Sequence, residues 1–108
     1  MPNTERVRAL NDAFRTTLQG GKIMLTSSVS ELPEATRGHL LRGVMTFDAF
    51  DLANDPYGEH DFGGVDIDGE HYLFKLDYYD TSLTYGSEDP ADPEKTTRVL
   101  TIMRADEY

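Results

Sequence analysis

The chain contains no cysteine and no tryptophan, and none of its apolar stretches is long enough to span a membrane. Without cysteine there can be no disulfides, thiol catalysis, iron–sulfur clusters or thiolate zinc sites. No apolar block follows the N-terminal charges, as a secretory signal would require, so we expect a cytoplasmic protein with no membrane partner. Five phenylalanines and six tyrosines still provide for one modest core, and we predict a single domain over residues 1–108.

Basic side chains are scarce in the middle of the chain. Residues 48–94 hold fourteen acidic residues and a single basic one, Lys75, whereas the segments on either side are slightly positive. The formal net charge of the whole chain is −10. A negative field repels nucleic acid and anionic membranes and attracts cations or a basic protein surface. We therefore expect a protein partner with a basic surface and no direct nucleic-acid binding. The alternative is that the acids serve only solubility.

The N-terminal segment has the apolar spacing of an amphipathic helix. It follows the N-cap candidates Asn3 and Thr4, and its apolar residues recur at three- and four-residue steps: Val7, Leu10, Phe14 and Leu18. We expect the helix to end at Gly20-Gly21, because glycine readily takes the left-handed conformation found there. Its arginines fall mostly off the apolar stripe and are expected in solvent: Arg6, Arg8 and Arg15.

A second amphipathic helix is predicted from about Pro33 to Phe47, with proline in its first turn. Gly38 and Gly43 weaken it by roughly 1 kcal/mol each relative to alanine. Either close packing or simple tolerance explains each glycine.

Three further regions have the composition of strands. Residues 22–29 and 96–103 are apolar and rich in β-formers, and the latter has the character of a central strand. Between them, Asp68-Gly69 predicts a two-residue hairpin turn that pairs residue 67 with 70, 66 with 71 and 65 with 72. Alternation then assigns one hairpin face to the core: Val65, Ile67, Tyr72, Phe74, Leu76 and Tyr78.

The predicted order of elements is α-β-α-β-β-β. This order indicates an α+β fold, with an antiparallel sheet of about four strands and two helices packed on one face. Residues 48–64 and 80–94 have no periodic pattern and contain turn residues, which is unusual in a compact domain unless the loops are functional or mobile. We expect these two acidic loops to lie together or at one edge of the sheet.

Five short signatures occur along the chain: RALNDAFR at residues 8–15, NDPYGEHDFG at 54–63, KLDYYD at 75–80, GSEDPADP at 86–93 and TRVLTIM at 97–103. In that order they resemble the bacterial domain of unknown function 3768. The resemblance implies a small single-domain protein of alphaproteobacteria, often encoded on plasmids and prophages, with no established activity. Small acidic proteins of mobile elements commonly block host defence enzymes, so the resemblance adds that setting to the expectation.

Glu59, His60 and Asp61 are the residues whose types best suit a divalent metal. Their spacing is not diagnostic, and a pairing across the hairpin explains His71 and Asp66 without a metal. A structural interpretation, in which the three residues cap their own loop, competes with the metal site. We therefore predict no cofactor and keep a small metal-binding or metal-assisted hydrolase domain as an alternative.

The candidate interaction surface consists of acidic and aromatic loop residues: Asp55, Tyr57, Glu59, Tyr79, Asp80, Tyr85, Glu88, Asp89, Asp92 and Glu94. Tyrosine is enriched at protein–protein interfaces, and carboxylates on a rigid surface can imitate the phosphates of nucleic acid. Asp77 and Asp80 have the chemistry for acid–base catalysis, but aspartate is also common where a strand turns. No nucleophile triad, phosphate loop, dinucleotide motif or calcium loop is present, so we predict no catalytic residue.

We therefore expect a non-enzymatic, acidic protein-binding module from a mobile genetic element. Its expected role is inhibition of a host nucleic-acid-handling defence protein, of the anti-CRISPR or anti-restriction type, by nucleic-acid mimicry. Besides the metal-dependent alternative, a structural or oligomerising module stays open. The sequence leaves the partner and the oligomeric state undetermined.

Overall fold

The computed structural model describes residues 3–108, and it contains the predicted order α-β-α-β-β-β with two short additional helices. In chain order they are α1 (Thr4–Thr17), β1 (Lys22–Leu25), α2 (Ser27–Ser30), α3 (Glu34–Thr46), β2 (Phe62–Ile67), β3 (Glu70–Tyr79), β4 (Thr97–Arg104) and the 3-10 helix η1 (Ala105–Glu107). The prediction of an α+β fold is confirmed.

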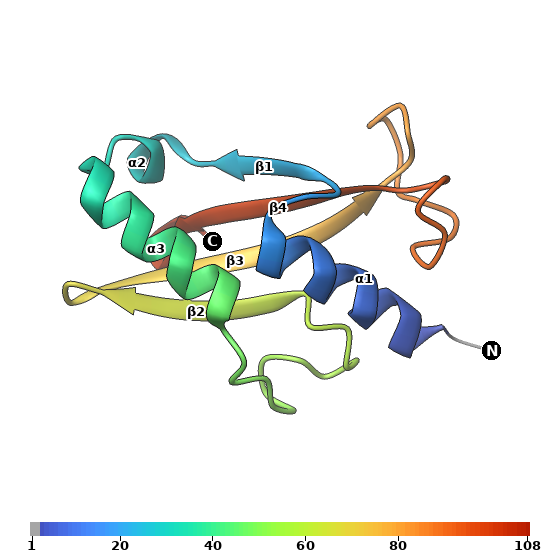
Figure 1. Cartoon of the computed structure of the whole chain (residues 1–108), viewed down its shortest axis with the longest axis horizontal. Helices are drawn as coiled ribbons and strands as arrows, with labels where there is room; N and C mark the ends of the chain where they lie inside the picture. The colour runs from blue at the N-terminus through green and yellow to red at the C-terminus, as the bar shows by residue number, and fades with distance from the viewer. Residues whose placement is uncertain (1–2) are drawn as a thin grey trace.

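The strands form one four-stranded sheet in the order β1-β4-β3-β2 (Figure 1). β2 and β3 pair antiparallel, as do β3 and β4, but β1 runs parallel to β4. The sheet is therefore mixed, and the expectation of a wholly antiparallel sheet is wrong at β1. Two helices and the hairpin separate β1 from β4 in the chain, which leaves enough length for β4 to return in the same direction. The last strand is central, as predicted.

The hairpin forms with the predicted register. Val65 faces Tyr72, Asp66 faces His71 and Ile67 faces Glu70. Both turn residues have positive φ, 53° at Asp68 and 82° at Gly69, as a type I′ turn requires. Because side chains alternate between the two faces of a strand, this register fixes which residues of β3 enter the core.

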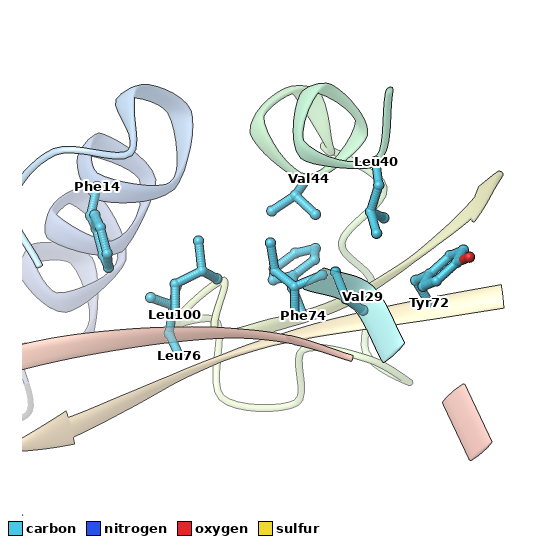
Figure 2. Close-up of a cluster of buried hydrophobic side chains, with 9 residues drawn as sticks. Phe14, Val29, Leu40, Val44, Tyr72, Phe74, Leu76 and Leu100 are labelled. Atoms are coloured by element: carbon cyan, nitrogen blue, oxygen red, sulfur yellow. The ribbon is translucent and has the colours of Figure 1, made fainter. Parts of the chain in front are cut away.

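The helices cover one face of the sheet, and the core lies between them and the inward side chains of β3 and β4 (Figure 2). Phe14 of α1 and Val44 of α3 point towards the sheet, where Phe74 and Leu100 meet them. The buried cluster as a whole contains Phe14, Val29, Leu40, Val44, Tyr72, Phe74, Leu76, Leu100 and Ile102. Among residues 3–108 no α-helix packs on the other face of the sheet, where Tyr108 lies against Phe62 (Figure 1).

Two details of the first third of the chain differ from expectation. β1 ends at Leu25, because Thr26 is the N-cap of the short helix α2, whose Val29 is fully buried in the core. α1 ends with Leu18 in the left-handed conformation, at a φ of 60°, before the two glycines are reached.

In residues 3–108 no helix is long and apolar enough to cross a membrane.

The prediction that Arg15 is solvated is wrong: its side chain is buried. Its Nη1 donates to the carbonyls of Val44 and Phe47, both at 2.9 Å, and its Nη2 donates to Asp12 at 3.1 Å. Helix ends leave carbonyls without partners within the helix, and here the guanidinium supplies donors to the end of α3. An arginine off the apolar stripe thus joins α1 to α3.

Candidate functional site

In the structure the two acidic loops extend between the helices and strands that flank them, over residues 47–61 and 80–96. Both loops are anchored to α1. Arg8 Nη1 donates to the carbonyl of Gly58 at 3.0 Å, and Asn11 Nδ2 donates to the carbonyl of Glu59 at 3.0 Å. Arg6 Nε holds the other loop by donating to the carbonyl of Ala91 at 3.0 Å. Glu59 and residues 89–91 line one hollow of about 250 Å³ together with the start of α1. The loops therefore lie together, as expected.

A buried polar network joins these anchors to the sheet. The Tyr78 hydroxyl donates to Glu59 Oε1 at 2.7 Å and accepts a hydrogen bond from Asn11 Nδ2 at 2.7 Å. Arg98 Nε donates to Asn11 Oδ1 at 2.8 Å, and Arg98 Nη2 donates to the carbonyl of Pro90. The network therefore fixes both loops to the inner face of β3 and β4.

Burial dominates the electrostatics of this network. It raises the pKa of Tyr78 well above the usual value for a phenol, and the hydrogen bond to Glu59 raises this pKa further. Burial also lowers the pKa of Arg98, whose guanidinium lies 5.2 Å from the centre of the Tyr78 ring. Tyr78 is therefore a protonated hydrogen-bond donor at neutral pH, and its role here is structural.

His60 is the most constrained residue of the first loop. It has a φ of 56°, and its ring stacks on Phe50 with 3.9 Å between ring centres. Its Nδ1 lies 2.9 Å from Asp12 Oδ1, and its Nε2 lies 3.7 Å from Asp55 Oδ2. The backbone N–H of His60 also donates to Asp55 Oδ1 at 3.1 Å. The contact with Asp12 binds the loop to α1, and the contacts with Phe50 and Asp55 hold the loop to itself. This agrees with the structural interpretation that competed with a metal site.

Glu59, His60 and Asp61 do not converge on one point. The carboxylate of Glu59 is engaged by Tyr78, and the ring of His60 lies between two aspartates. The pKa of Asp61 is raised, first by burial and then by the neighbouring negative charge of Glu59. Within residues 3–108 there is no group of three His, Asp or Glu side chains that could hold a metal ion. The ligand set that the metal-dependent alternative requires is therefore not assembled by these residues.

Several carboxylates of the second loop fold back on their own backbone. Asp80 Oδ1 accepts from Ser82 Oγ at 2.8 Å and from the Thr84 N–H at 3.0 Å, and these hydrogen bonds lower the pKa of Asp80. Asp89 Oδ1 accepts from the Ala91 N–H at 3.1 Å, and Asp92 Oδ1 accepts from the Glu94 N–H at 2.9 Å. These are turns closed by aspartate side chains, so each carboxylate is held in a fixed direction.

Residues 25–107 match the family model described as Protein of unknown function (DUF3768). The chain belongs to the DUF3768 family. The signature at residues 8–15 precedes the matched residues, and the other four lie within them. Neither a curated protein nor a solved structure matches the chain.

In this DUF3768 protein the predicted interaction residues do not all face solvent. Asp55 is only 6% exposed and is bonded to His60, and Glu59 turns inward to Tyr78. Tyr57 and Tyr85, by contrast, are 77% and 73% exposed. Of the predicted carboxylates in the second loop, Glu88 and Glu94 are exposed, whereas Asp80, Asp89 and Asp92 are half-buried.

Tyr79 lies elsewhere, on the open face of the sheet, where it lines a hollow with Leu83. Glu88 is within 3.7 Å of Lys95, but both side chains are largely exposed, so this ion pair contributes little to stability.

Sequence reasoning missed Asn11 and Arg98, which hold both loops. Asn11 lies four residues after Val7 on the apolar stripe, and Arg98 lies at an inward position of β4, so burial at these positions was the signal available.

Proposed function

We propose that this protein is a non-enzymatic binding module whose two acidic loops dock on a basic surface of a partner protein. The loops contain ten acidic residues and one basic residue, Lys95. A field of this sign draws a basic partner and accelerates encounter with it. Exposed Tyr57 and Tyr85 add the side-chain type that contributes most contact area at interfaces.

The fixed direction of the second-loop carboxylates carries this proposal. Asp80, Asp89 and Asp92 each use Oδ1 to close a turn, and among residues 3–108 their Oδ2 atoms form no hydrogen bond. A carboxylate that is already ordered loses little conformational entropy when it binds. The free oxygens are therefore suited to accept hydrogen bonds from arginine or lysine side chains of a partner.

The partner best matched to such a surface is a protein that normally binds nucleic acid. Its groove presents arginine and lysine to phosphates, and ordered carboxylates compete for the same donors. We propose that the module inhibits a nucleic-acid-handling defence protein of the host, in the manner of an anti-CRISPR or anti-restriction protein encoded by a mobile element. Affinity should then fall as salt is raised.

Affinity capture from a lysate of the host tests the proposal with two variants of equal charge. One carries Glu88→Gln, Asp89→Asn, Asp92→Asn and Glu94→Gln, in which asparagine keeps the oxygen that closes each turn. The matched control neutralises four exposed residues outside the loops: Glu5→Gln, Glu31→Gln, Glu34→Gln and Asp68→Asn. Both variants lose the same amount of negative charge.

We expect the loop variant to lose a nucleic-acid-binding partner that the unmodified protein and the control variant both capture. The captured amount should decrease between low and high salt. Equal capture by the two variants would show that the loops do not form the docking surface. Capture that is indifferent to salt would remove the electrostatic basis of the proposal.

A further inference from the structure

Strand β1 forms an open edge of the sheet, on the far side from the hairpin (Figure 1). Its apolar side chains are unusually exposed for a strand, 37% at Ile23 and 55% at Met24. The opposite edge, β2, carries the exposed carboxylate of Asp66 and borders α3. Charged residues and cover are the common means by which proteins protect a sheet edge from pairing. β1 has neither proline nor an acidic residue, and Lys22 is its only charge.

The backbone of β1 has hydrogen-bonding groups that face away from the sheet. The Thr26 N–H donates to the Ile102 carbonyl at 3.2 Å, which places the backbone groups of Thr26 and Met24 on the side of β4. Alternation along the strand then turns the N–H and C=O of Ile23 and Leu25 outward. Within residues 3–108 no loop backbone or side chain forms a hydrogen bond with these outward groups. Pairing with the extended backbone of another segment satisfies such outward N–H and C=O groups.

Beside this edge, the open face of the sheet is hollowed. The hollow has a volume of about 520 Å³ and its walls are mostly apolar, from Met24, Leu25, Leu83 and Val99. Met24 and Val99 point to this face, because side chains alternate along a strand and Leu100 and Ile102 of β4 point into the core. Side chains at alternate positions of an added strand would enter this hollow.

The charges at the hollow indicate which strand fits. Lys75 is paired with Asp77 at 3.1 Å on the same face. Lys22, at the start of β1, has no carboxylate within ion-pair distance among residues 3–108, and it also lines the hollow. The edge therefore has one free positive charge in a protein of net charge −10. An acidic side chain on an incoming strand complements Lys22.

We propose that β1 accepts an extended segment of a partner protein as a fifth strand of the sheet, with apolar side chains at alternate positions and an acidic side chain facing Lys22. This surface is separate from the two acidic loops, and it does not depend on the function proposed for them. Two hydroxyls hold the far end of β1 in place, since Thr26 and Ser28 donate to Glu107 at 2.9 Å and 2.8 Å. A second copy of the chain is a less suitable occupant, because each copy carries a charge of −10.

Synthetic peptides of about ten residues, with valine and threonine alternating, provide the probe. One peptide carries a single glutamate at a terminal position and its twin carries lysine there, and binding is followed by fluorescence anisotropy. N-methylation of the amides on one edge of the peptide removes the donors that pair with β1, whereas methylation of the other edge leaves them. We expect the glutamate peptide to bind at least about tenfold more tightly than the version methylated on the pairing edge, as two lost hydrogen bonds imply.

Variants of the protein test the same contact from the other side. Ile23→Pro removes an outward donor while sparing the bonds to β4, because proline is tolerated where the N–H faces solvent. Ile23→Val is the control that keeps the donor, and circular dichroism establishes whether both fold. Lys22→Glu should reverse the preference so that the lysine peptide binds more tightly. Should Ile23→Pro fail to fold, the methylated peptides and Lys22→Glu still decide the result.

Three results would overturn the proposal. In the first, neither peptide binds at millimolar concentration. In the second, methylation of either edge has the same effect, which indicates apolar contact without strand pairing. In the third, sedimentation shows a dimer that Ile23→Pro dissociates, which assigns the edge to a second copy. Protection of the Ile23 and Leu25 amides from hydrogen exchange only when the glutamate peptide is present would support it.

Discussion

Arg98 Nε donates a hydrogen bond to Asn11 Oδ1 at 2.8 Å, and this bond joins the last strand to the first helix. Both side chains are buried, with Asn11 fully shielded from solvent. A buried guanidinium is costly unless its donors are paired, and Asn11 is the side chain that pairs with Nε here. Because Asn11 also donates to Tyr78 and to the Glu59 carbonyl, one amide organises both acidic loops.

Asn11→Ala should therefore destabilise the protein by about 2–4 kcal/mol, since it leaves Arg98 Nε and its neighbours without partners in a buried position. Urea unfolding followed by circular dichroism measures the loss. Asn3→Ala is the control, because Asn3 is exposed and its side chain caps no backbone group. We expect that variant to stay within about 0.5 kcal/mol of the unmodified protein.

The coupling between the two residues can be measured directly. In a double-mutant cycle, Asn11→Ala should lower the free energy of unfolding less when Arg98→Met is also present, because the unpaired guanidinium is then absent. If the two single losses of unfolding free energy add up to the loss in the double variant within about 0.5 kcal/mol, the hydrogen bond between Asn11 and Arg98 is not the cause of the destabilisation.

Tyr78 should stay un-ionised at pH values where an exposed phenol titrates, near 10. Burial and the Glu59 hydrogen bond raise its pKa in the folded state. Ultraviolet titration of the folded protein and of Tyr78→Phe should then count the same number of phenolates near pH 11. After unfolding in urea at that pH, the unmodified protein should show one more. One extra phenolate in the folded unmodified protein would contradict the prediction.

The same shift gives a dependence of stability on pH. A phenol whose pKa is higher in the folded state than in the unfolded state favours folding while it is protonated. This contribution is complete below the unfolded pKa and is lost as the pH rises above it. Between pH 9 and 12 the free energy of unfolding should therefore decline more steeply in the unmodified protein than in Tyr78→Phe, as urea titrations at each pH will show.

The features of the fold that the sequence predicts correctly are local. The Asp68-Gly69 turn fixes the hairpin register within a few residues, and apolar spacing alone locates α1 and α3. The direction of β1 is not local, because it depends on how the chain returns to pair with β4 after the hairpin.

The anchors of the candidate site depend on tertiary contacts in the same way. Arg15 looks solvated on a helical wheel, yet it is buried because the end of α3 brings three carbonyl acceptors to it. The acidic loops and their exposed tyrosines could be predicted from composition, but the inward turn of Asp55 and Glu59 could not. Those two carboxylates turn inward because His60 and Tyr78, which are distant in sequence or separated by a turn, offer donors there.

The two glycines of α3 illustrate a choice that the sequence left open. A Cβ at Gly43 would lie 2.7 Å from Val65 Cγ1, whereas a Cβ at Gly38 would meet nothing within 4 Å. Gly43 thus permits close packing of α3 on β2, and Gly38 is simply tolerated. Gly38→Ala should stabilise the protein by about 0.5–1 kcal/mol through helix propensity.

Gly43→Ala gains the same propensity but forces the stiff side chain of Val65 to move, and overpacking of this kind costs about 1–3 kcal/mol. The two substitutions should therefore change the melting temperature in opposite directions. Adding Val65→Ala should reduce the penalty of Gly43→Ala, because the clashing methyl groups are then absent. Stabilisation by both glycine substitutions would show that α3 and β2 are not in close contact at this point.

Asp61 provides a prediction at the acid end of the pH range. Burial, and then the neighbouring charge of Glu59, raise its pKa. The folded state therefore favours the protonated carboxyl and is destabilised when the carboxyl ionises. Asp61→Asn should be more stable than the unmodified protein at pH 7, and this advantage should shrink as the pH falls through the folded pKa and vanish below about 3.8, where the carboxyl is protonated in both states. Asp66→Asn is the control, because Asp66 is exposed and pairs only with His71. Urea unfolding at a series of pH values measures both variants, and an advantage of Asp61→Asn that persists unchanged into acid would mean that its cause is packing and not charge.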